Sequence, residues 1–148
     1  KMKIFTFIII LFSIMVNAQT KKINLKIDHQ ALIVNDLKKS GDFYTKVLGF
    51  EEIENASGGS PKRWFKNSEG KEIHLIYREK LVDELPKDIH MAYKVDDLIS
   101  FIDHLKNLGI EFSDWPGNKN QVQLRKDGFN QIYIQDPTGY WIEINDVK

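Results

Sequence analysis

The sequence predicts an α+β protein built from two similar halves, and three repeated patterns indicate it. In each half a histidine, His29 or His90, stands seven residues before an Asp-Leu pair. Each half then runs through an amphipathic segment to a Leu-Gly pair. Later in each half a residue of metal-ligand type, His74 or Glu143, stands four residues after a glycine. Because the spacing is kept around ligand-type side chains, the repeat predicts a site that the two halves share.

The first half is expected to fold in the order β-α-β-β. Residues 27–34 are rich in β-branched and apolar side chains, which favours a strand, and Asp36 stands where a helix N-cap is needed. Apolar residues then recur at helical spacing until Gly49, which ends the helix. The expected elements after it are a loop over 55–61 and strands over 63–66 and 72–77, and residues 50–54 can form a further strand.

The second half is expected to follow the same order after a linker over residues 81–88. Residues 90–95 favour a strand, Asp97 can cap the next helix, and Gly109 ends it. The later strands are expected over 122–125, 131–135 and 140–145, with a strong turn signal at 136–139. Each half is too small to bury both faces of its own sheet, so we expect the halves to pack together.

The first 18 residues are typical of a secretory signal peptide. Lys1 and Lys3 precede thirteen uncharged, mainly apolar residues, 4–16, and small residues suit a cleavage site after Ala18. A thirteen-residue helix is about 20 Å long, shorter than the ~30 Å hydrocarbon core of a bilayer. We therefore expect export to the periplasm or the extracellular space, with no stable membrane anchor after cleavage.

Composition limits what residues 19–148 can be. They are expected to form a single domain of two half-modules, about 23–80 and 88–148. The absence of cysteine excludes disulfides, thiolate metal sites and a thiol nucleophile. Without Lys1 and Lys3, 19 of the 21 basic residues remain against 21 acidic ones, so nucleic acid is not expected as a partner.

Four side chains are candidate metal ligands: His29, His74, His90 and Glu143. Glu143 lies between two isoleucines on the last expected strand, and an unpaired buried carboxylate is costly, so packing explains it poorly. A single strand histidine is more often an ordinary core or surface residue, but four such residues at repeat-equivalent positions favour a metal site. Three imidazoles and one carboxylate suit one divalent Fe, Mn, Co, Ni or Zn ion. A scaffold that has lost its metal is the alternative.

Essentially all of residues 19–148 resembles the vicinal oxygen chelate superfamily, which includes class I glyoxalase, extradiol dioxygenases, fosfomycin-modifying enzymes and bleomycin-binding proteins. The resemblance is carried by Asp28-His29, Asp36-Leu37, residues 43–50, Ile73-His74-Leu75, His90, Val95-Asp96 and residues 136–143. It implies paired βαβββ modules forming a curved mixed sheet around a metal-binding cleft, with the four candidates above as ligands. These motifs are specific for the superfamily and weak for any one activity.

The resemblance implies three alternative functions. The first is a glyoxalase-type lyase or isomerase that acts on a small molecule with vicinal oxygens through an enediolate-type intermediate, with Glu143 as ligand and general base. The second is an Fe(II)-dependent dioxygenase, and the third is a non-catalytic antibiotic- or metabolite-binding protein. His74 departs from the glyoxalase-like pattern, which usually has glutamate there, so one carboxylate remains as base and the site is more cationic. An export signal argues against a glutathione-derived substrate.

Five more residues are candidates for contacting a substrate: Arg63, Trp64, Arg125, Tyr133 and Trp141. They can offer an anion clamp and aromatic walls. The alternative is equally open, with tryptophans in the core and arginines on the surface. The modules can close the cleft within one chain or by exchange in a homodimer, and the linker length does not decide between these arrangements.

Overall fold

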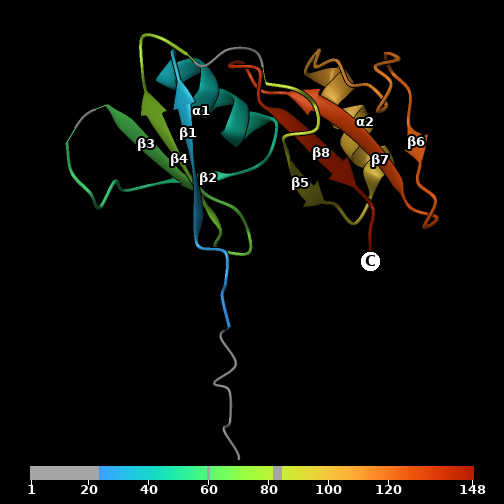
Figure 1. Cartoon of the computed structure of the whole chain (residues 1–148), viewed down its shortest axis with the longest axis horizontal. Helices are drawn as coiled ribbons and strands as arrows, with labels where there is room; N and C mark the ends of the chain where they lie inside the picture. Colours follow the sequence, from blue (N-terminus) through green and yellow to red (C-terminus); the bar gives the residue numbers. More distant parts are fainter. Residues whose placement is uncertain (1–23, 60, 82–84) are drawn as a thin grey trace, which may run out of the picture.

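The computed structural model describes residues 24–59, 61–81 and 85–148. The predicted signal peptide, residues 1–18, lies outside the described part. Within the described ranges, no helix has the length and apolar character that crossing a membrane requires. Figure 1 shows two units side by side, each made of strands and a helix.

The first module contains four strands and one helix. These are β1 (His29–Val34), α1 (Leu37–Lys46), β2 (Glu51–Ile53), β3 (Lys62–Lys66) and β4 (Glu72–Tyr77). The sheet has the order β1-β4-β3-β2, with β1 parallel to β4 and the other neighbours antiparallel. The short strand β2 lies within residues 50–54, where the sequence allowed a further strand.

The second module repeats this topology. It contains β5 (His90–Lys94), α2 (Leu98–Asn107), β6 (Gln123–Leu124), β7 (Asn130–Gln135) and β8 (Trp141–Asn145), in the sheet order β5-β8-β7-β6. The α+β paired-module fold is thus confirmed. The expected curved sheet is divided into two four-stranded sheets, which no strand pairing joins in the part of the chain that the structure describes.

Equivalent residues begin and end the two helices. Asp36 and Asp97 adopt extended backbone conformations, and each side chain accepts a hydrogen bond from the N–H three residues later, at 2.8 and 3.0 Å. Gly49 and Gly109 follow the helices with φ of 70° and 66°, a conformation that favours glycine. The capping residues expected from the sequence are confirmed.

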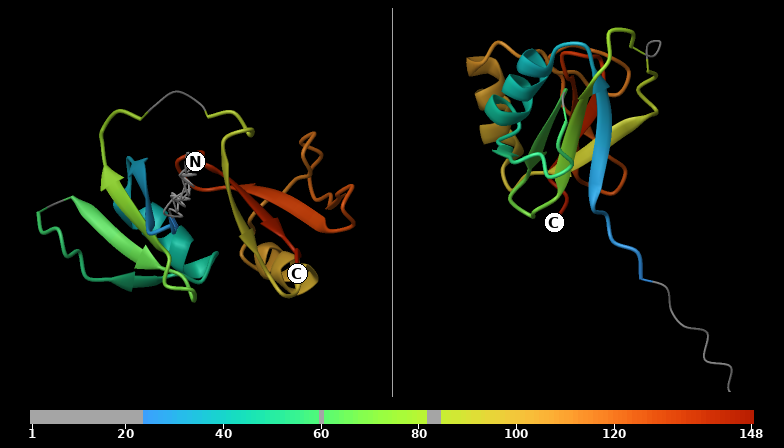
Figure 2. Two further views of the ribbon diagram at one scale, coloured as in Figure 1. Left: turned by 60° about the horizontal axis from the view of Figure 1, so that its bottom comes forward. Right: turned by 90° about the vertical axis from the view of Figure 1, so that its left-hand side faces the viewer.

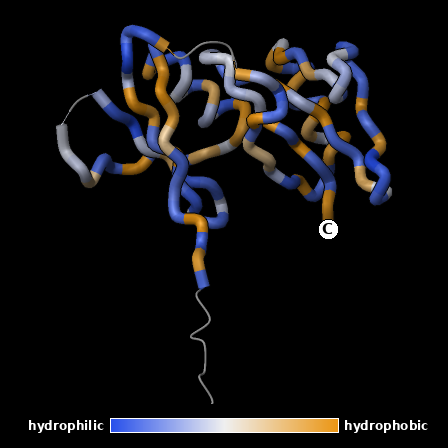
Figure 3. Tube along the Cα trace, in the orientation of Figure 1, coloured by the Kyte–Doolittle hydropathy of each residue, from blue (hydrophilic) through white to orange (hydrophobic). Residues whose placement is uncertain are grey.

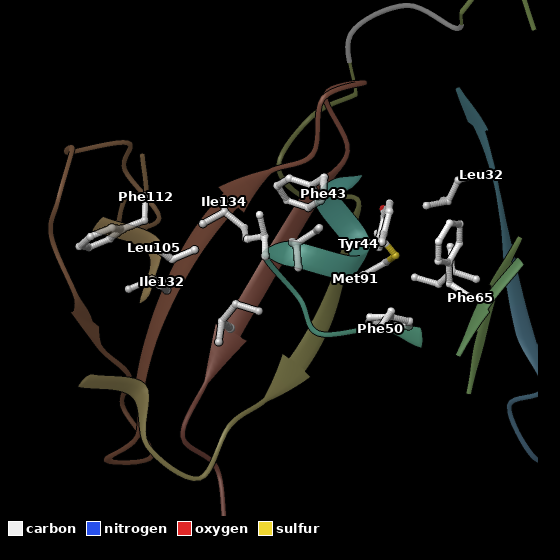
Figure 4. Packing of buried hydrophobic residues seen from close by; sticks show 14 of the residues in the cluster. Leu32, Phe43, Tyr44, Phe50, Phe65, Met91, Leu105, Phe112, Ile132 and Ile134 are labelled. Carbon is white, nitrogen blue, oxygen red and sulfur yellow. The ribbon is translucent and has the colours of Figure 1, made fainter. Parts of the chain in front are cut away.

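The two modules share one hydrophobic core, and α1 lies between their sheets (Figure 4). Tyr44 on α1 is fully buried, and its hydroxyl donates to Asp136 Oδ2 of the second module at 3.1 Å. Burial raises the pKa of Asp136. The helices also touch each other, because the His104 ring on α2 lies 3.0 Å from the Lys46 carbonyl oxygen on α1 (Figure 2).

Each sheet turns one face to this core and keeps polar side chains on the other. Ile142 and Ile144 are fully buried on the core face of β8, whereas Glu143 points to the opposite face. The same alternation places Ile73 and Leu75 in the core and His74 opposite. Figure 3 shows the resulting mixture of apolar and polar positions along the strands. We call the side of each sheet that carries His74 or Glu143 the ligand face of that sheet.

Candidate metal centre

The four predicted ligands lie on the ligand faces as two pairs. His29 on β1 lies beside His74 on the neighbouring strand β4, with ring centroids 4.2 Å apart. His90 on β5 faces Glu143 on the neighbouring strand β8, with Nε2 and Oε2 3.4 Å apart. The strand register is equivalent in the two modules. Ala31, two residues after His29, pairs with His74, and the alanine two residues after His90 pairs with Glu143. The sequence repeat therefore corresponds to a structural one.

The His90 ring is oriented by the linker. Its Nδ1 lies 2.8 Å from the main-chain oxygen of Lys87. A carbonyl oxygen can only accept, so Nδ1 carries a proton and donates it. In the neutral ring Nε2 then keeps its lone pair, and this is the nitrogen that faces Glu143. A metal bound by this pair would meet His90 in the required tautomer.

Glu143 is buried, with 7% of its surface exposed, and three neighbours donate hydrogen bonds to it. Tyr133 Oη donates to Oε2 at 2.6 Å, while Asn145 Nδ2 and Arg125 Nη1 donate to Oε1 at 2.8 and 3.3 Å. Burial and the bond to Glu143 raise the pKa of Tyr133, so its hydroxyl remains a donor at neutral pH. These bonds offset the cost of removing the carboxylate from water.

The first-module pair forms part of a stack of three rings. The His74 ring lies between the rings of His29 and Trp64. The centroids of the His74 and Trp64 rings are 3.8 Å apart, and the angle between the two ring planes is 6°. Two carboxylates contact the imidazoles: Asp28 Oδ2 lies 2.7 Å from His29 Nδ1, and Glu72 Oε2 lies 2.7 Å from His74 Nε2. Both carboxylate contacts leave the second ring nitrogen available to a ligand.

The donor atoms fit a divalent transition metal in kind. Each of the three histidines holds one ring nitrogen against an oxygen atom, as metal-bound histidines commonly do. The arrangement within one chain differs from the expected shared site. Among the described residues, no group of three or more His, Cys, Asp or Glu side chains is close enough to hold a metal. One chain therefore presents the candidate ligands as two pairs, His29–His74 and His90–Glu143, which we call half-sites.

The sequence profile of the Glyoxalase/Bleomycin resistance protein/Dioxygenase superfamily matches residues 26–144. The chain belongs to this superfamily. It is 31% identical over 130 residues to a probable lactoylglutathione lyase from Vibrio cholerae, an alignment that covers 82% of this chain and 90% of that protein.

Solved structures show the same fold. A putative glyoxalase family protein from Bacillus anthracis superposes with a TM-score of 0.68 at 24% identity, covering 86% of this chain and 99% of that one. The fosfomycin resistance protein FosX from Listeria monocytogenes gives 0.66 at 22% identity, covering 83% and 93%. Members of the superfamily typically bind a divalent metal and a small-molecule substrate, and they often dimerise.

Four of the five predicted substrate residues lie on the ligand faces of this superfamily member. Arg125 and Tyr133 contact Glu143 directly. Trp64 covers His74, and its buried indole Nε1 has no hydrogen-bond partner among the described residues. Trp141 is covered by the Lys87 ammonium, 4.3 Å from its ring. The aromatic walls are thus divided between the two half-sites.

Arg63 differs from the expectation. Its Nε and Nη2 donate to the two carboxylate oxygens of Glu52 at 2.8 and 2.7 Å, and its Nη1 donates to the Leu37 carbonyl at 2.8 Å. Adjacent residues on a strand point to opposite faces, so Arg63 points toward α1 while Trp64 points to the ligand face. In this structure Arg63 thus pairs with Glu52 and the Leu37 carbonyl on the side of the sheet opposite Trp64.

Four neighbours of the half-sites were not predicted as site residues: Asp28, Glu72, Lys87 and Asn145. Glu72 shares a strand face with His74, and alternation could have identified it, because the two are separated by one residue. Lys87 lies in the expected linker, where no pattern marks it. Only the contacts that Lys87 makes with residues 113–115 and with His90 reveal it.

Proposed function

We propose that this chain is a metal-dependent lyase or isomerase of the glyoxalase type. Its substrate would be a small molecule with two vicinal oxygens, converted through an enediolate-type intermediate. The observation that carries the proposal is Glu143, a buried carboxylate that three donors hold opposite His90 Nε2. Superfamily membership and the similarity to a probable lactoylglutathione lyase support it.

The complete site would form between two copies of the chain. Each copy carries both half-sites, and two ligands are too few for a stable transition-metal site. In a two-fold dimer, the His29–His74 pair of one copy would meet the His90–Glu143 pair of the other, and two equivalent sites would result. Three neutral imidazoles and one carboxylate leave a divalent site with a net positive charge, which suits an anionic pair of substrate oxygens.

When bound, the metal would act as a Lewis acid that polarises the two substrate oxygens and acidifies the adjacent C–H. Glu143 would take that proton and return it to the neighbouring carbon. Asn145 keeps Oε1 in place, so Oε2 can change partners while the carboxylate stays oriented. Arg125 adds a positive charge beside the carboxylate and would help to stabilise negative charge on the substrate. With histidine at position 74, Glu143 would be the one base, which suffices for a proton shuttle.

A dioxygenase remains the second candidate, because the donor set favours it. Three imidazoles with one carboxylate suit Fe(II) and leave positions for oxygen and substrate. Consumption of O₂ by the iron-loaded protein would distinguish this reaction from a redox-neutral isomerisation. Saturable ligand binding that survives loss of His29 and Glu143 would instead indicate the third alternative, a non-catalytic protein that binds an antibiotic or a metabolite.

We also propose that the protein is exported, on the basis of residues 1–18. Its substrate is then expected outside the cytoplasm, which makes a glutathione adduct a poor candidate. Fractionation of cells that express the full chain tests this, because a cytoplasmic protein that keeps residues 1–18 would contradict export.

Metal content is the experiment that tests the function. The purified protein should bind about one transition-metal ion per chain, and His29→Ala/Glu143→Ala should bind none. Binding of Fe would direct the next assay to oxygen uptake, and binding of Zn, Ni, Co or Mn to isomerisation of α-hydroxycarbonyl compounds. Absence of binding after reconstitution with each metal would contradict both enzymatic functions.

A further inference from the structure

The side chain of Lys87 crosses from the linker onto the ligand face of the second module. Its ammonium lies 4.3 Å from the centre of the Trp141 ring and 5.2 Å from that of Tyr133, within the range of cation–π attraction. Nζ also lies within hydrogen-bonding distance of three oxygen atoms of residues 113–115, at 3.3, 3.0 and 3.1 Å. Desolvation in this environment lowers the pKa of Lys87. The ammonium thus has acceptors for its three protons and two aromatic faces around it.

The main chain of the same residue holds the metal-ligand candidate His90. Lys87 O accepts the His90 Nδ1 proton at 2.8 Å. Lys87 belongs to a tight turn in which the Ile89 N–H donates to the Pro86 carbonyl at 3.0 Å, and His90 follows this turn as the first residue of β5. A single residue therefore contacts the second module through its side chain and the His90 ring through its carbonyl.

We propose that Lys87 is a positioning residue for His90. The anchored ammonium fixes the linker turn, so the Lys87 carbonyl keeps His90 in the Nδ1–H tautomer with Nε2 directed at Glu143. The part of this inference that concerns metal affinity rests on the proposed function. The part that concerns the tautomer does not, because the contacts are made by the protein alone.

Burial explains why the side chain of Lys87 is needed. Pro86, Asp88 and Ile89 are exposed, and Lys87 is the residue of this turn whose side chain is partly buried. A turn held only by its own hydrogen bond would leave the Lys87 carbonyl free to move relative to β5. A histidine ring exposed to water samples both neutral tautomers, so loss of the carbonyl bond would release the Nε2–H form, which cannot bind a metal through Nε2.

Lys87→Met is the direct test, because methionine has a similar length but lacks the charge and the three donors. Lys119→Met is the matched control, since Lys119 pairs with Glu111 on the exposed surface of the same module. Lys87→Arg restores the cation and hydrogen-bond donors. The readouts are the ¹⁵N NMR signals of the His90 ring in metal-free protein, at a pH where the ring is neutral, and the Kd for Zn²⁺ from competition with a chelator.

We expect Lys87→Met to convert His90 from a pure Nδ1–H form to a mixture and to weaken Zn²⁺ binding about 10- to 100-fold, the usual effect of losing an outer hydrogen-bond partner. Lys119→Met should match the wild type, and Lys87→Arg should restore the Nδ1–H signal. An unchanged His90 tautomer in folded Lys87→Met would overturn the inference. A changed tautomer in a protein that binds no metal would support the positioning role while refuting the proposed function. If Lys87→Met does not fold, Ser113→Ala is the second variant, because it removes one of the oxygen atoms that accept hydrogen bonds from Lys87 Nζ. A partial change of the His90 tautomer is then expected, and an unchanged tautomer would count against the inference.

Discussion

Removing the hydroxyl of Tyr133 should weaken metal binding more than it weakens the fold. The hydroxyl donates to Glu143 Oε2 at 2.6 Å, and Asn145 and Arg125 remain as donors to Oε1 after Tyr133→Phe. A hydrogen bond to a charged group contributes about 1.5–3 kcal/mol, and because two donors remain, we expect a loss of stability of about 1 kcal/mol. Without this donor Oε2 is directed at His90 less firmly, so metal affinity should fall about 10- to 100-fold, or ~1.4–2.7 kcal/mol.

Tyr140→Phe provides the matched control for this prediction. The Tyr140 hydroxyl accepts a hydrogen bond from the Ile33 N–H at 3.2 Å, so its loss should destabilise the fold without touching Glu143. The assay compares Kd for Zn²⁺ by chelator competition with unfolding in urea for both variants. Equal metal affinity in Tyr133→Phe and Tyr140→Phe, within about twofold, would refute the orienting role of Tyr133.

Three further predictions concern the fold. Tyr44→Phe leaves the buried Asp136 without its partner across the modules and should cost about 1.5–3 kcal/mol in urea unfolding; an unchanged midpoint would contradict that contact. Hydrogen bonds from the side chain and backbone of Ser100 lower the pKa of Asp97 in the folded protein. The ionised Asp97 side chain should therefore stabilise the fold above the unfolded pKa of 3.8, and this stabilisation should be lost as the pH falls through the lower pKa of the folded state. The difference in melting temperature between wild type and Asp97→Asn should therefore stay constant from neutral pH down to about pH 4 and shrink as the pH falls below 3.8. A difference that stays constant below that pH would contradict the contribution of Asp97. Arg63→Gln should lower thermal stability with metal affinity unchanged, and a loss of affinity would return Arg63 to the site.

The secondary structure could be predicted because local rules determine it. Asp36 and Asp97 cap helices through their own side chains, and glycines 49 and 109 end them, so each boundary depends on nearby residues. Strand alternation also predicts that Glu143 points away from its isoleucine neighbours, and the structure confirms it. Alternation applied to residues 63 and 64 would have separated Arg63 from Trp64.

The arrangement of the site could not be predicted from the repeat. Equivalent positions establish that His29 corresponds to His90 and His74 to Glu143, but not whether the two pairs meet in one chain. That depends on how α1 packs between the sheets, through contacts such as Tyr44 with Asp136 that join distant segments. The proposed role of Lys87 could not be predicted for the same reason, since its partners are residues far away in the sequence, such as Asp114 and Trp141.

Mixing two defective chains tests most directly whether two half-sites form one metal centre. One chain carries His29→Ala/His74→Ala, the other His90→Ala/Glu143→Ala, and neither alone can supply four ligands. If the site forms between copies, random pairing makes roughly half of the dimers mixed, each with one complete site of two, so the mixture should bind about a quarter of the wild-type metal. Each variant alone should bind none. No metal in a mixture whose subunits have demonstrably exchanged, beside full binding by the wild type, would contradict assembly of the site from two chains.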